Sequence, residues 1–249
     1  MSQVTTPAIV LHAFRYGETS KIVRLATREL GVVSAVARGA HRPKSQFGAH
    51  LQPLSDGIAR LYVRPNRDLQ TMAEFDLTNH RAELANDVGR FAAASALAEL
   101  VLRLAPAEAR PEIYDVLGAS LDSMMHAEPA DVTSVALMAM WSLIGALGFS
   151  PALDHCAVDG VPLDDTVRDF SVIEGGFLCA ACQRSRETTP LPATDRTALH
   201  AFANGRLPDV PLDARHAAAH RRLFVRFVRR HAAEEKDLRA LRFWETLSA

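Results

Sequence analysis

Residues 31–45 read GVVSAVARGAHRPKS, an apolar run that passes directly into a cationic loop. The run Val32–Ala37 is rich in β-branched residues, which predicts a short strand, and Gly39 and Pro43 predict a turn after it. The loop holds no acidic residue, and its cationic or titratable side chains are Arg38, His41, Arg42 and Lys44. Cations held close together suit phosphate, because binding releases condensed counterions. A loop that is merely solvated is the alternative at this point.

Short apolar runs surround this stretch and are separated by turn residues. The sequence predicts strands at Ala8–Phe14, Lys21–Ala26, Val32–Ala37, Ile58–Val63 and Leu69–Phe75. Five short strands within about seventy residues are typical of a small closed β-barrel. An OB-fold is the first expectation, and an SH3-like barrel fits the spacing nearly as well. The barrel is assigned to residues 1–78.

The hydrophobic period changes from two to about 3.6 residues after Asn79, which predicts helices. Helices are expected from about Leu84 to a stop at Pro106, over Glu112–Met125, from about Asp131 to Leu147, and over Thr194–Ala203, Asp213–Ala233 and Leu238–Leu247. Methionines and Trp141 on the third of these indicate a buried core helix. Residues 79–249 are therefore assigned to a helical domain, interrupted by a cysteine-containing hairpin at about 150–185. The expected fold class is α+β.

The composition is that of a globular protein. Hydrophobic residues make up 48% of the 249 residues and charged residues 23%, so one large or two modest packed domains are expected. No apolar run is long enough to span a bilayer. The first residues lack the apolar core of a secretion signal, because His12, Arg15 and Glu18 interrupt it. A cytoplasmic location is therefore expected.

The formal net charge of −1 conceals a strong asymmetry along the chain. Residues 1–80 carry ten Lys or Arg and six Asp or Glu, a net of +4. Residues 81–195 carry seven and seventeen, a net of −10, and residues 196–249 carry eleven and six, a net of +5. Two basic ends around an acidic middle favour a polyanion-binding surface. In the last segment Arg222, Arg226 and Arg229 share one helix face, which is either solvated or a phosphate contact.

Three cysteines stand close together in the hairpin segment. They occur in CAVD at Cys156–Asp159 and in CAAC at Cys179–Cys182. Two C-x-x-C turns would supply four thiolates to zinc, but Asp159, whose carboxylate can also bind zinc, takes the second position. The candidate ligands are Cys156, Asp159, Cys179 and Cys182, with His155 as another candidate for the fourth position. The alternative is a hairpin that keeps its fold by packing of Phe170 and Phe177.

Enzymatic motifs are weak or missing. His126-Ala-Glu128 together with the later C-x-x-C turn superficially matches the zinc deaminase pattern. However, Leu178 replaces the proline of that pattern, and Pro129 indicates that His126 lies in a loop ahead of a helix. The sequence contains no Gly-x-x-x-x-Gly-Lys-Ser/Thr phosphate loop and no Gly-x-Ser-x-Gly nucleophile elbow. The chain is therefore not expected to be an enzyme or to use a nucleotide.

Three longer segments resemble one known family, the bacterial recombination mediator RecO. They are AIVLHAFRYGETSKIVRLATRELGVVSAVARGAHRPKS at Ala8–Ser45, LYVRPNRDLQTMAEFD at Leu61–Asp76, and LGFSPALDHCAVDG with FSVIEGGFLCAAC within Leu147–Cys182. The first and third segments are the most specific, and the helices between them are generic. The resemblance covers most of the chain.

The resemblance implies an N-terminal OB-fold, a helical domain and an inserted zinc-ribbon-like hairpin. It implies binding of single- and double-stranded DNA, annealing of complementary strands, and binding of the tail of single-stranded DNA-binding protein (SSB). It also implies that the protein acts together with RecR to load RecA, that it does so at the nucleoid, and that it needs no nucleotide cofactor. Family members often carry four cysteines at the hairpin, whereas Asp159 takes the second position here. The resemblance therefore implies the hairpin itself, and leaves two alternatives for it: a hairpin that binds Zn²⁺ and a hairpin that folds without metal.

The basic face of the barrel is the expected DNA surface. Its candidate residues are Arg15, Lys21, Arg24, Arg38, Arg42, Lys44, Arg64 and Arg67. Candidate platforms for stacked bases are Phe14, Tyr16, Phe47 and Tyr62, although each fits the barrel core better. The acidic SSB tail needs a cationic and apolar dock, for which the candidates are Arg222, Arg226, Arg229 and Phe227. The alternative function is an OB-fold adaptor that binds proteins and has no DNA affinity of its own.

Overall fold

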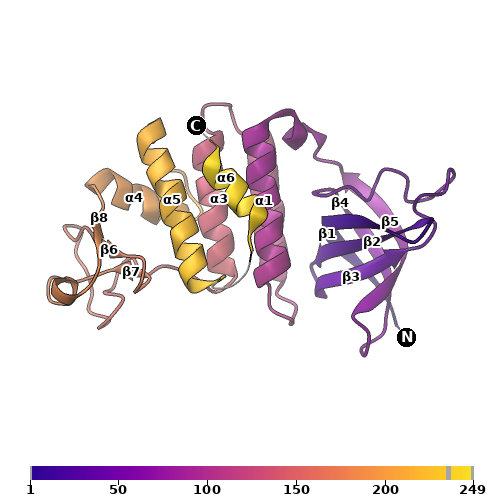
Figure 1. Ribbon diagram of the computed structural model, residues 1–249, viewed down its shortest axis with the longest axis horizontal. Helices are drawn as coiled ribbons and strands as arrows, with labels where there is room; N and C mark the ends of the chain where they lie inside the picture. Colours follow the sequence, from indigo (N-terminus) through magenta and orange to yellow (C-terminus); the bar gives the residue numbers. More distant parts are fainter. Residues whose placement is uncertain (1, 234–236, 248–249) are drawn as a thin grey trace. The chain divides into compact units, whose positions relative to one another are not determined.

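The computed structural model describes residues 2–233 and 237–247 of the chain. The chain divides into two compact units, Met1–His126 and Ala127–Ala249. The first holds a β-barrel and two α-helices, and the second holds further helices and a small sheet (Figure 1). Within the described ranges, every helix is too short or too polar to serve as a membrane span. The first unit thus extends beyond residue 78, where the sequence places the end of the barrel domain.

Five strands close the barrel in the order β1-β2-β3-β5-β4, and β4 pairs back onto β1. They are β1 (Ser2–Tyr16), β2 (Ser20–Thr27), β3 (Gly31–Ala37), β4 (Asp56–Val63) and β5 (Leu69–Asn79). Strands β3 and β5 run parallel, and the other neighbouring pairs are antiparallel. The interior is filled by alternate side chains such as Val10, Leu25 and Leu61, none of them exposed. The predicted five-stranded OB-fold barrel and the α+β class are confirmed.

Strand β1 begins at Ser2 rather than at Ala8, where the apolar run begins. Its first half pairs with β4, from Ser2 opposite Val63, and its second half pairs with β2, up to Tyr16 opposite Ser20. The residues before Ala8 are mostly polar and have no apolar periodicity. The ladder to β4, rather than local propensity, therefore makes them a strand.

Two helices complete the first unit. Helices α1 (Val88–Leu104) and α2 (Pro111–His126) pack on each other and against β1 and β2. A short 3₁₀-helix, Ala82–Asn86, precedes them, and Asp87 caps α1 by accepting a hydrogen bond from the Arg90 N–H at 2.8 Å. His126 is the last residue of α2, so the expectation that it lies in a loop is wrong.

Arg81 links the barrel to α2 inside this unit. Its buried guanidinium donates to Asp122 Oδ1 on α2 at 2.8 Å, to Asp56 Oδ2 on β4 at 3.2 Å and to the Leu54 carbonyl at 3.1 Å. The hydroxyl of Tyr114 on α2 donates to the second oxygen of Asp56 at 3.1 Å. One buried charge therefore has all its partners supplied by the two elements that it joins.

The second unit is built around α3. Its described α-helices are α3 (Val132–Ala146), α4 (Ala193–Ala203), α5 (Ala214–His231) and α6 (Arg239–Thr246), and a 3₁₀-helix covers Cys182–Ser185. Helix α3 packs against α4 and α5, and α6 packs against α5. Trp141 is 1% exposed and meets Phe224 and Phe227 edge-on, with ring centroids 4.9 and 5.1 Å apart. The predicted core helix is therefore confirmed.

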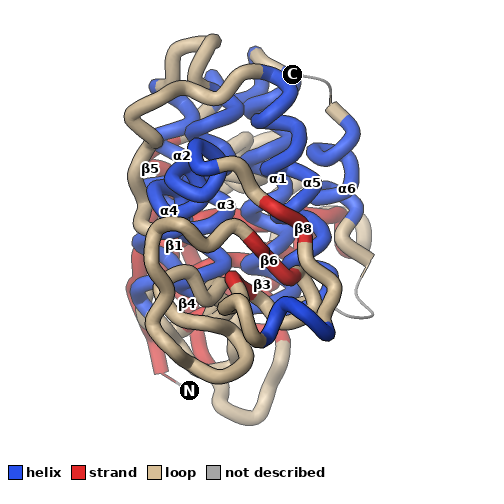
Figure 2. The backbone as a smooth tube through the Cα atoms, turned by 90° about the vertical axis from the view of Figure 1, so that its left-hand side faces the viewer, coloured by secondary structure: helices blue, strands red, loops and turns tan. Residues whose placement is uncertain are grey.

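The segment between α3 and α4 is mostly loop around a small sheet, as the tan and red tube of Figure 2 shows. The sheet has the order β7-β6-β8, with β6 at Asp169–Ser171, β7 at Gly176–Phe177 and β8 at Thr189–Pro190. Phe170 and Phe177 are paired across the β6–β7 hairpin and fully buried, with their rings edge to face and the ring centroids 5.2 Å apart. The predicted hairpin is present, and Phe177 also packs against His200 of α4.

Candidate nucleic-acid interface and metal cluster

Barrel closure places the cationic loop beside the start of β5. In the parallel ladder Ser34 lies opposite Leu69 and Ala37 opposite Met72, so Arg38 leaves β3 next to β5. The loop is tied to the β1–β2 turn, because the His41 N–H donates to the Thr19 carbonyl at 2.8 Å.

Gly39 makes room for one of the loop arginines. Its φ of +73° is a left-handed conformation that side-chain-bearing residues rarely adopt, and a Cβ there would lie 3.3 Å from Arg42 Cδ. The absence of a side chain at Gly39 therefore lets the loop turn sharply while the Arg42 side chain packs against the Gly39 backbone.

Two adjoining hollows open on the outside of the barrel. The Tyr16 hollow, about 360 Å³, is lined by Tyr16, Thr19, Ser20, Val36, Arg38, Gly39, Arg42, Arg67, Leu69 and Thr71. The Tyr62 hollow, about 210 Å³, is lined by Arg38, Tyr62, Arg64, Arg67, Leu69, Gln70 and Thr71. Of the eight predicted DNA-binding cations, the structure brings together Arg38, Arg42, Arg64 and Arg67 at these hollows.

The other four predicted cations lie outside both linings. Arg15 turns back over its own hairpin and donates to the carbonyls of Gly17 and Glu18 at 3.3 and 3.2 Å. Lys21 and Arg24 are half-buried on β2, and Lys44 is exposed farther along the loop. The eight predicted cations therefore form two groups: four arginines that line the adjoining hollows, and four cations that do not.

The arginines of the Tyr16 hollow carry uncompensated charge. Within the described residues, no carboxylate lies at ion-pair distance from Arg38, Arg42 or Arg67, and each of these side chains is exposed. Elsewhere on the barrel, by contrast, Arg60 pairs with Glu74 at 2.8 Å. An anion that enters the hollow therefore meets guanidinium groups that have no competing partner.

Gln70, which was not predicted from the sequence as a functional residue, positions Arg64 and Arg67. It is 9% exposed; its Oε1 accepts the Arg64 N–H at 2.8 Å, and its Nε2 donates to the carbonyls of Arg64, at 3.2 Å, and Arg67. The side chain therefore clamps the β4–β5 turn that presents both arginines. The available signal was a polar residue in the same inward register as Met72, since a buried amide must find partners.

The four predicted stacking residues lie in different environments. Phe47 is 2% exposed and belongs to the barrel core, whereas Tyr62 is half-buried at the Tyr62 hollow. Phe14 and Tyr16 are 45% and 52% exposed, so the expectation that they are core residues is wrong. They lie on the part of β1 that pairs with β2 alone, beyond the ladder to β4.

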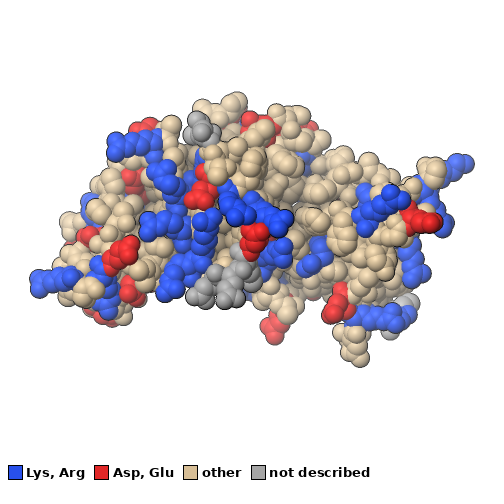
Figure 3. Space-filling view, in the orientation of Figure 1, with Lys and Arg blue, Asp and Glu red and all other residues tan. Residues whose placement is uncertain are grey.

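A third concavity, the α5 groove, lies in the second unit and has a volume of about 420 Å³. It is lined by Thr189, Pro190, Leu191, Pro192, Asp195, Arg215, His216, Ala219, His220, Arg222, Leu223 and Arg226. Figure 3 shows cationic side chains gathered over α5. Of the predicted dock, Arg222 and Arg226 line the groove, while Arg229 is 55% exposed outside it. Phe227 is 2% exposed and packs on Trp141, so it offers no docking surface.

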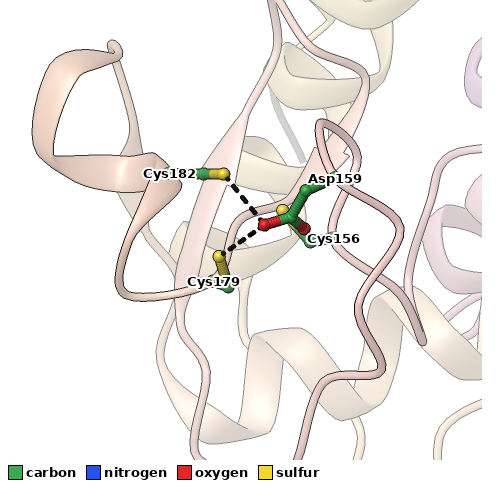
Figure 4. A group of neighbouring side chains, drawn as sticks. All are labelled: Cys156, Asp159, Cys179 and Cys182. Atoms are coloured by element: carbon green, nitrogen blue, oxygen red, sulfur yellow. Dashed lines mark hydrogen bonds between the residues drawn. The ribbon is translucent and has the colours of Figure 1, made fainter.

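The four predicted metal ligands meet in one place, as Figure 4 shows. The donor atoms of Cys156, Asp159, Cys179 and Cys182 all lie within 4.8 Å of one another. Two turns bring them together: the Gly160 N–H bonds the Cys156 carbonyl at 2.9 Å, and the Gln183 N–H bonds the Cys179 carbonyl at 3.1 Å. His155, the other candidate for the fourth position, is not part of the group, and neither is His126.

Hydrogen bonds join two of the cysteines to the one carboxylate of the cluster. The thiols of Cys179 and Cys182 donate to Asp159 Oδ2 at 3.4 and 3.3 Å. Hydrogen bonds from the Cys156 thiol, the Val161 N–H and the Cys182 thiol lower the pKa of Asp159 to about 2. Burial and the bond to Asp159 raise the pKa of Cys182 to about 12. Three sulfurs and one carboxylate at this spacing fit the donor set and size of a tetrahedral Zn²⁺ site.

Comparison with known families accounts for nearly the whole chain. The family described as recombination protein O, N terminal, matches residues 1–81, and its C-terminal counterpart matches residues 85–240. This chain belongs to the RecO family. The family resemblance predicted from sequence is confirmed. The N-terminal RecO match contains every residue that lines the Tyr16 and Tyr62 hollows, and the C-terminal match contains the four candidate metal ligands and the α5 groove.

Several curated relatives are named DNA repair protein RecO. The one from Anaeromyxobacter dehalogenans (strain 2CP-C) is 32% identical over 252 residues, which cover 99% of this chain and 98% of that protein. The one from Anaeromyxobacter sp. (strain K) is 34% identical over 209 residues, or 83% and 82% of the two chains. The RecO protein of Syntrophotalea carbinolica is 33% identical over 183 residues, or 73% and 70%.

Proposed function

We propose that this chain is a DNA-binding recombination mediator in DNA repair, with residues 1–78 as its principal DNA-binding domain. It binds single- and double-stranded DNA, anneals complementary strands and, with RecR, helps to load RecA onto SSB-coated strands at the nucleoid. RecO family membership and the names of the relatives support this role. The observation that carries the DNA-binding part is the pair of adjoining barrel hollows, which are lined by four arginines from two turns.

Phosphate neutralisation explains how such a surface can act without nucleotide hydrolysis. Arginines held in place release counterions from each phosphate that they contact, and this release drives binding. Two strands whose phosphates are neutralised also repel each other less, which favours annealing. The role therefore requires a cationic surface and no catalytic group.

Binding of a labelled single strand, measured by fluorescence anisotropy at several salt concentrations, tests the DNA-binding part. The variant Arg38→Glu/Arg67→Glu removes the two arginines common to both hollows. The control Arg28→Glu/Arg110→Glu changes the net charge equally but alters two exposed arginines that pair with Asp115 and Glu112. We expect steep salt dependence in the wild type, with a slope of about −0.7 per phosphate contacted, and a shallower slope with at least about tenfold weaker binding in the first variant alone. Absent or salt-independent binding would favour the protein-binding adaptor, and equal losses in both variants would show that net charge rather than the hollows governs binding.

The α5 groove is the proposed dock for the SSB tail. Its apolar wall includes Leu191 and Leu223, and its rim carries Arg222 and Arg226. An acidic peptide with apolar side chains matches both features. Arg222→Glu/Arg226→Glu is expected to abolish binding of an SSB tail peptide in a titration, whereas Arg229→Glu, outside the groove, is expected to leave it intact. Unchanged affinity in the double variant would exclude this dock.

We also propose that Cys156, Asp159, Cys179 and Cys182 hold one Zn²⁺. Bound zinc would supply a tetrahedral cross-link between the two turns of the hairpin. Metal analysis of the purified chain is expected to give one zinc per chain in the wild type and in Asp159→Cys, and much less in Cys156→Ser. A wild type without zinc, whose melting temperature is unchanged by a chelator, would instead favour a hairpin held by Phe170 and Phe177.

A further inference from the structure

Tyr16 is exposed in a barrel whose other large rings are mostly covered. Its side chain is 52% exposed, whereas Phe47 and Phe75 are 2% and 3% exposed in the core. An exposed ring forgoes the free energy that burial would provide, so a ring beside a hollow is a candidate contact. Phe14, at 45%, is equally exposed but lines neither hollow.

The rest of the Tyr16 hollow combines apolar and cationic groups. Val36 and Leu69 contribute apolar surface, and Arg38, Arg42 and Arg67 contribute guanidinium groups without acidic partners among the described residues. Its volume of about 360 Å³ falls within the roughly 300–1,000 Å³ of small-ligand sites. A ligand with a flat ring and an attached anion uses all of these features.

We propose that the Tyr16 hollow holds one unpaired nucleotide, its base against the Tyr16 ring and its phosphate among Arg38, Arg42 and Arg67. This inference rests on the proposed DNA binding and adds the basis for distinguishing strands. In a duplex, the faces of each base are covered by stacked neighbours, so only an unpaired nucleotide can offer a base face to the ring. A duplex reaches the arginines through its phosphates alone. Tyr16 thus confers a preference for single strands, while the arginines bind both forms.

Three probes separate these contacts: a single strand with bases, the same strand with abasic sites, which has the same length and charge, and a duplex of the same length. The variants, made in the full chain, are Tyr16→Leu, Tyr16→Phe and the matched control Phe14→Leu. We expect Tyr16→Leu to weaken binding of the base-bearing strand about fivefold or more. It should leave the abasic strand, the duplex and the salt slope unchanged, because no phosphate contact is lost. Tyr16→Phe retains the ring and should match the wild type, as should Phe14→Leu.

Three results would overturn the inference: no loss in Tyr16→Leu, the same loss for all three probes, or the same loss in Phe14→Leu. In each case the wild type still binds DNA, so the proposed function survives. A wild type that binds none of the probes in a salt-dependent way would overturn the proposed function, and the nucleotide site with it.

Discussion

Gln70 and Arg81 are two buried polar side chains of the first unit, and each makes several hydrogen bonds. Gln70 holds the turn that presents Arg64 and Arg67, and Arg81 joins the barrel to α2. Neither side chain lines the Tyr16 hollow. Arg81 lines neither hollow, so altering it changes support alone, whereas Gln70 also lines the Tyr62 hollow and its alteration changes that lining as well as the turn.

Gln70→Ala is expected to lower the free energy of unfolding by about 1–3 kcal/mol, because it leaves buried backbone groups of the β4–β5 turn without partners. Single-strand affinity should fall as well, since Arg64 and Arg67 lose their fixed positions. Denaturant titration followed by far-ultraviolet circular dichroism, with anisotropy alongside, measures both. Gln46→Ala, which removes one hydrogen bond from an exposed side chain to the Ala73 carbonyl, is the control. Equal effects in the two variants would contradict the clamp.

Arg81→Met is expected to lower the free energy of unfolding by about 2–4 kcal/mol, because it leaves Asp56 and the Leu54 carbonyl without their hydrogen-bond donor. The cost should fall below that of a fully buried pair, because the side chains of Asp56 and Asp122 are 20% and 48% exposed. Arg81→Lys should recover only part of the loss, since an ammonium group cannot reproduce the planar fork of a guanidinium. Urea unfolding measures both variants, and a loss below about 0.5 kcal/mol in Arg81→Met would show that solvent replaces the network.

At the scale of elements, α4 and α5 share a buried polar contact. His220 on α5 is 2% exposed, and its Nε2 lies 3.1 Å from Asp195 Oδ1 on α4. Burial lowers the pKa of His220, although Asp195 acts in the opposite direction, and burial also lowers the pKa of His200. The folded state therefore binds fewer protons than the unfolded state at mildly acidic pH.

The stability of the second unit should accordingly decrease as the pH falls below about 6.5, the ordinary pKa of histidine. Tryptophan fluorescence during urea unfolding reports this unit alone, because Trp141 and Trp244 are the two tryptophans of the chain. His220→Gln keeps a donor for Asp195 but cannot titrate, so its stability should depend less on pH. The exposed His155→Gln should follow the wild type, and parallel curves for all three proteins would rule out His220 as the source.

Local patterns predicted the elements well, and long-range pairing explains most of the differences. The strand Val32–Ala37 follows from β-branched residues, and the turns at 156–160 and 179–183 follow from the spacing of the cysteines and Asp159. The start of β1 does not, because Ser2–Thr6 becomes a strand only through its ladder to β4. The cationic loop was predictable from its residues, whereas the joining of Arg67 to Arg38 depends on the parallel pairing of β3 with β5. The exposure of Tyr16 likewise depends on where the ladder to β4 ends.

For the whole molecule, local charge should outweigh net charge. The net charge of the chain is −1, but residues 1–80 carry a net of +4. At an ionic strength of about 0.15 M the Debye length is about 8 Å, so distant acidic residues are screened from the hollows. We expect the chain to be retained on immobilised heparin at that ionic strength despite its pI of about 6.8. Arg38→Glu/Arg67→Glu should elute at clearly lower salt than Arg28→Glu/Arg110→Glu, and co-elution of the two variants would show that net charge governs retention.

The parallel ladder between β3 and β5 also makes barrel closure a reporter of the proposed nucleic-acid binding. It joins Ser34–Ala37 to Leu69–Met72, two segments far apart in the chain, so closing it costs loop entropy that a hairpin avoids. The Tyr16 hollow needs both segments and so exists only in the closed barrel. A single strand present at a hundred times its Kd for the proposed site would therefore stabilise the closed barrel by about 2.7 kcal/mol. The amide hydrogens of Leu69–Met72 should then exchange with deuterium more slowly, so that occupancy can be read from the protein with unlabelled DNA.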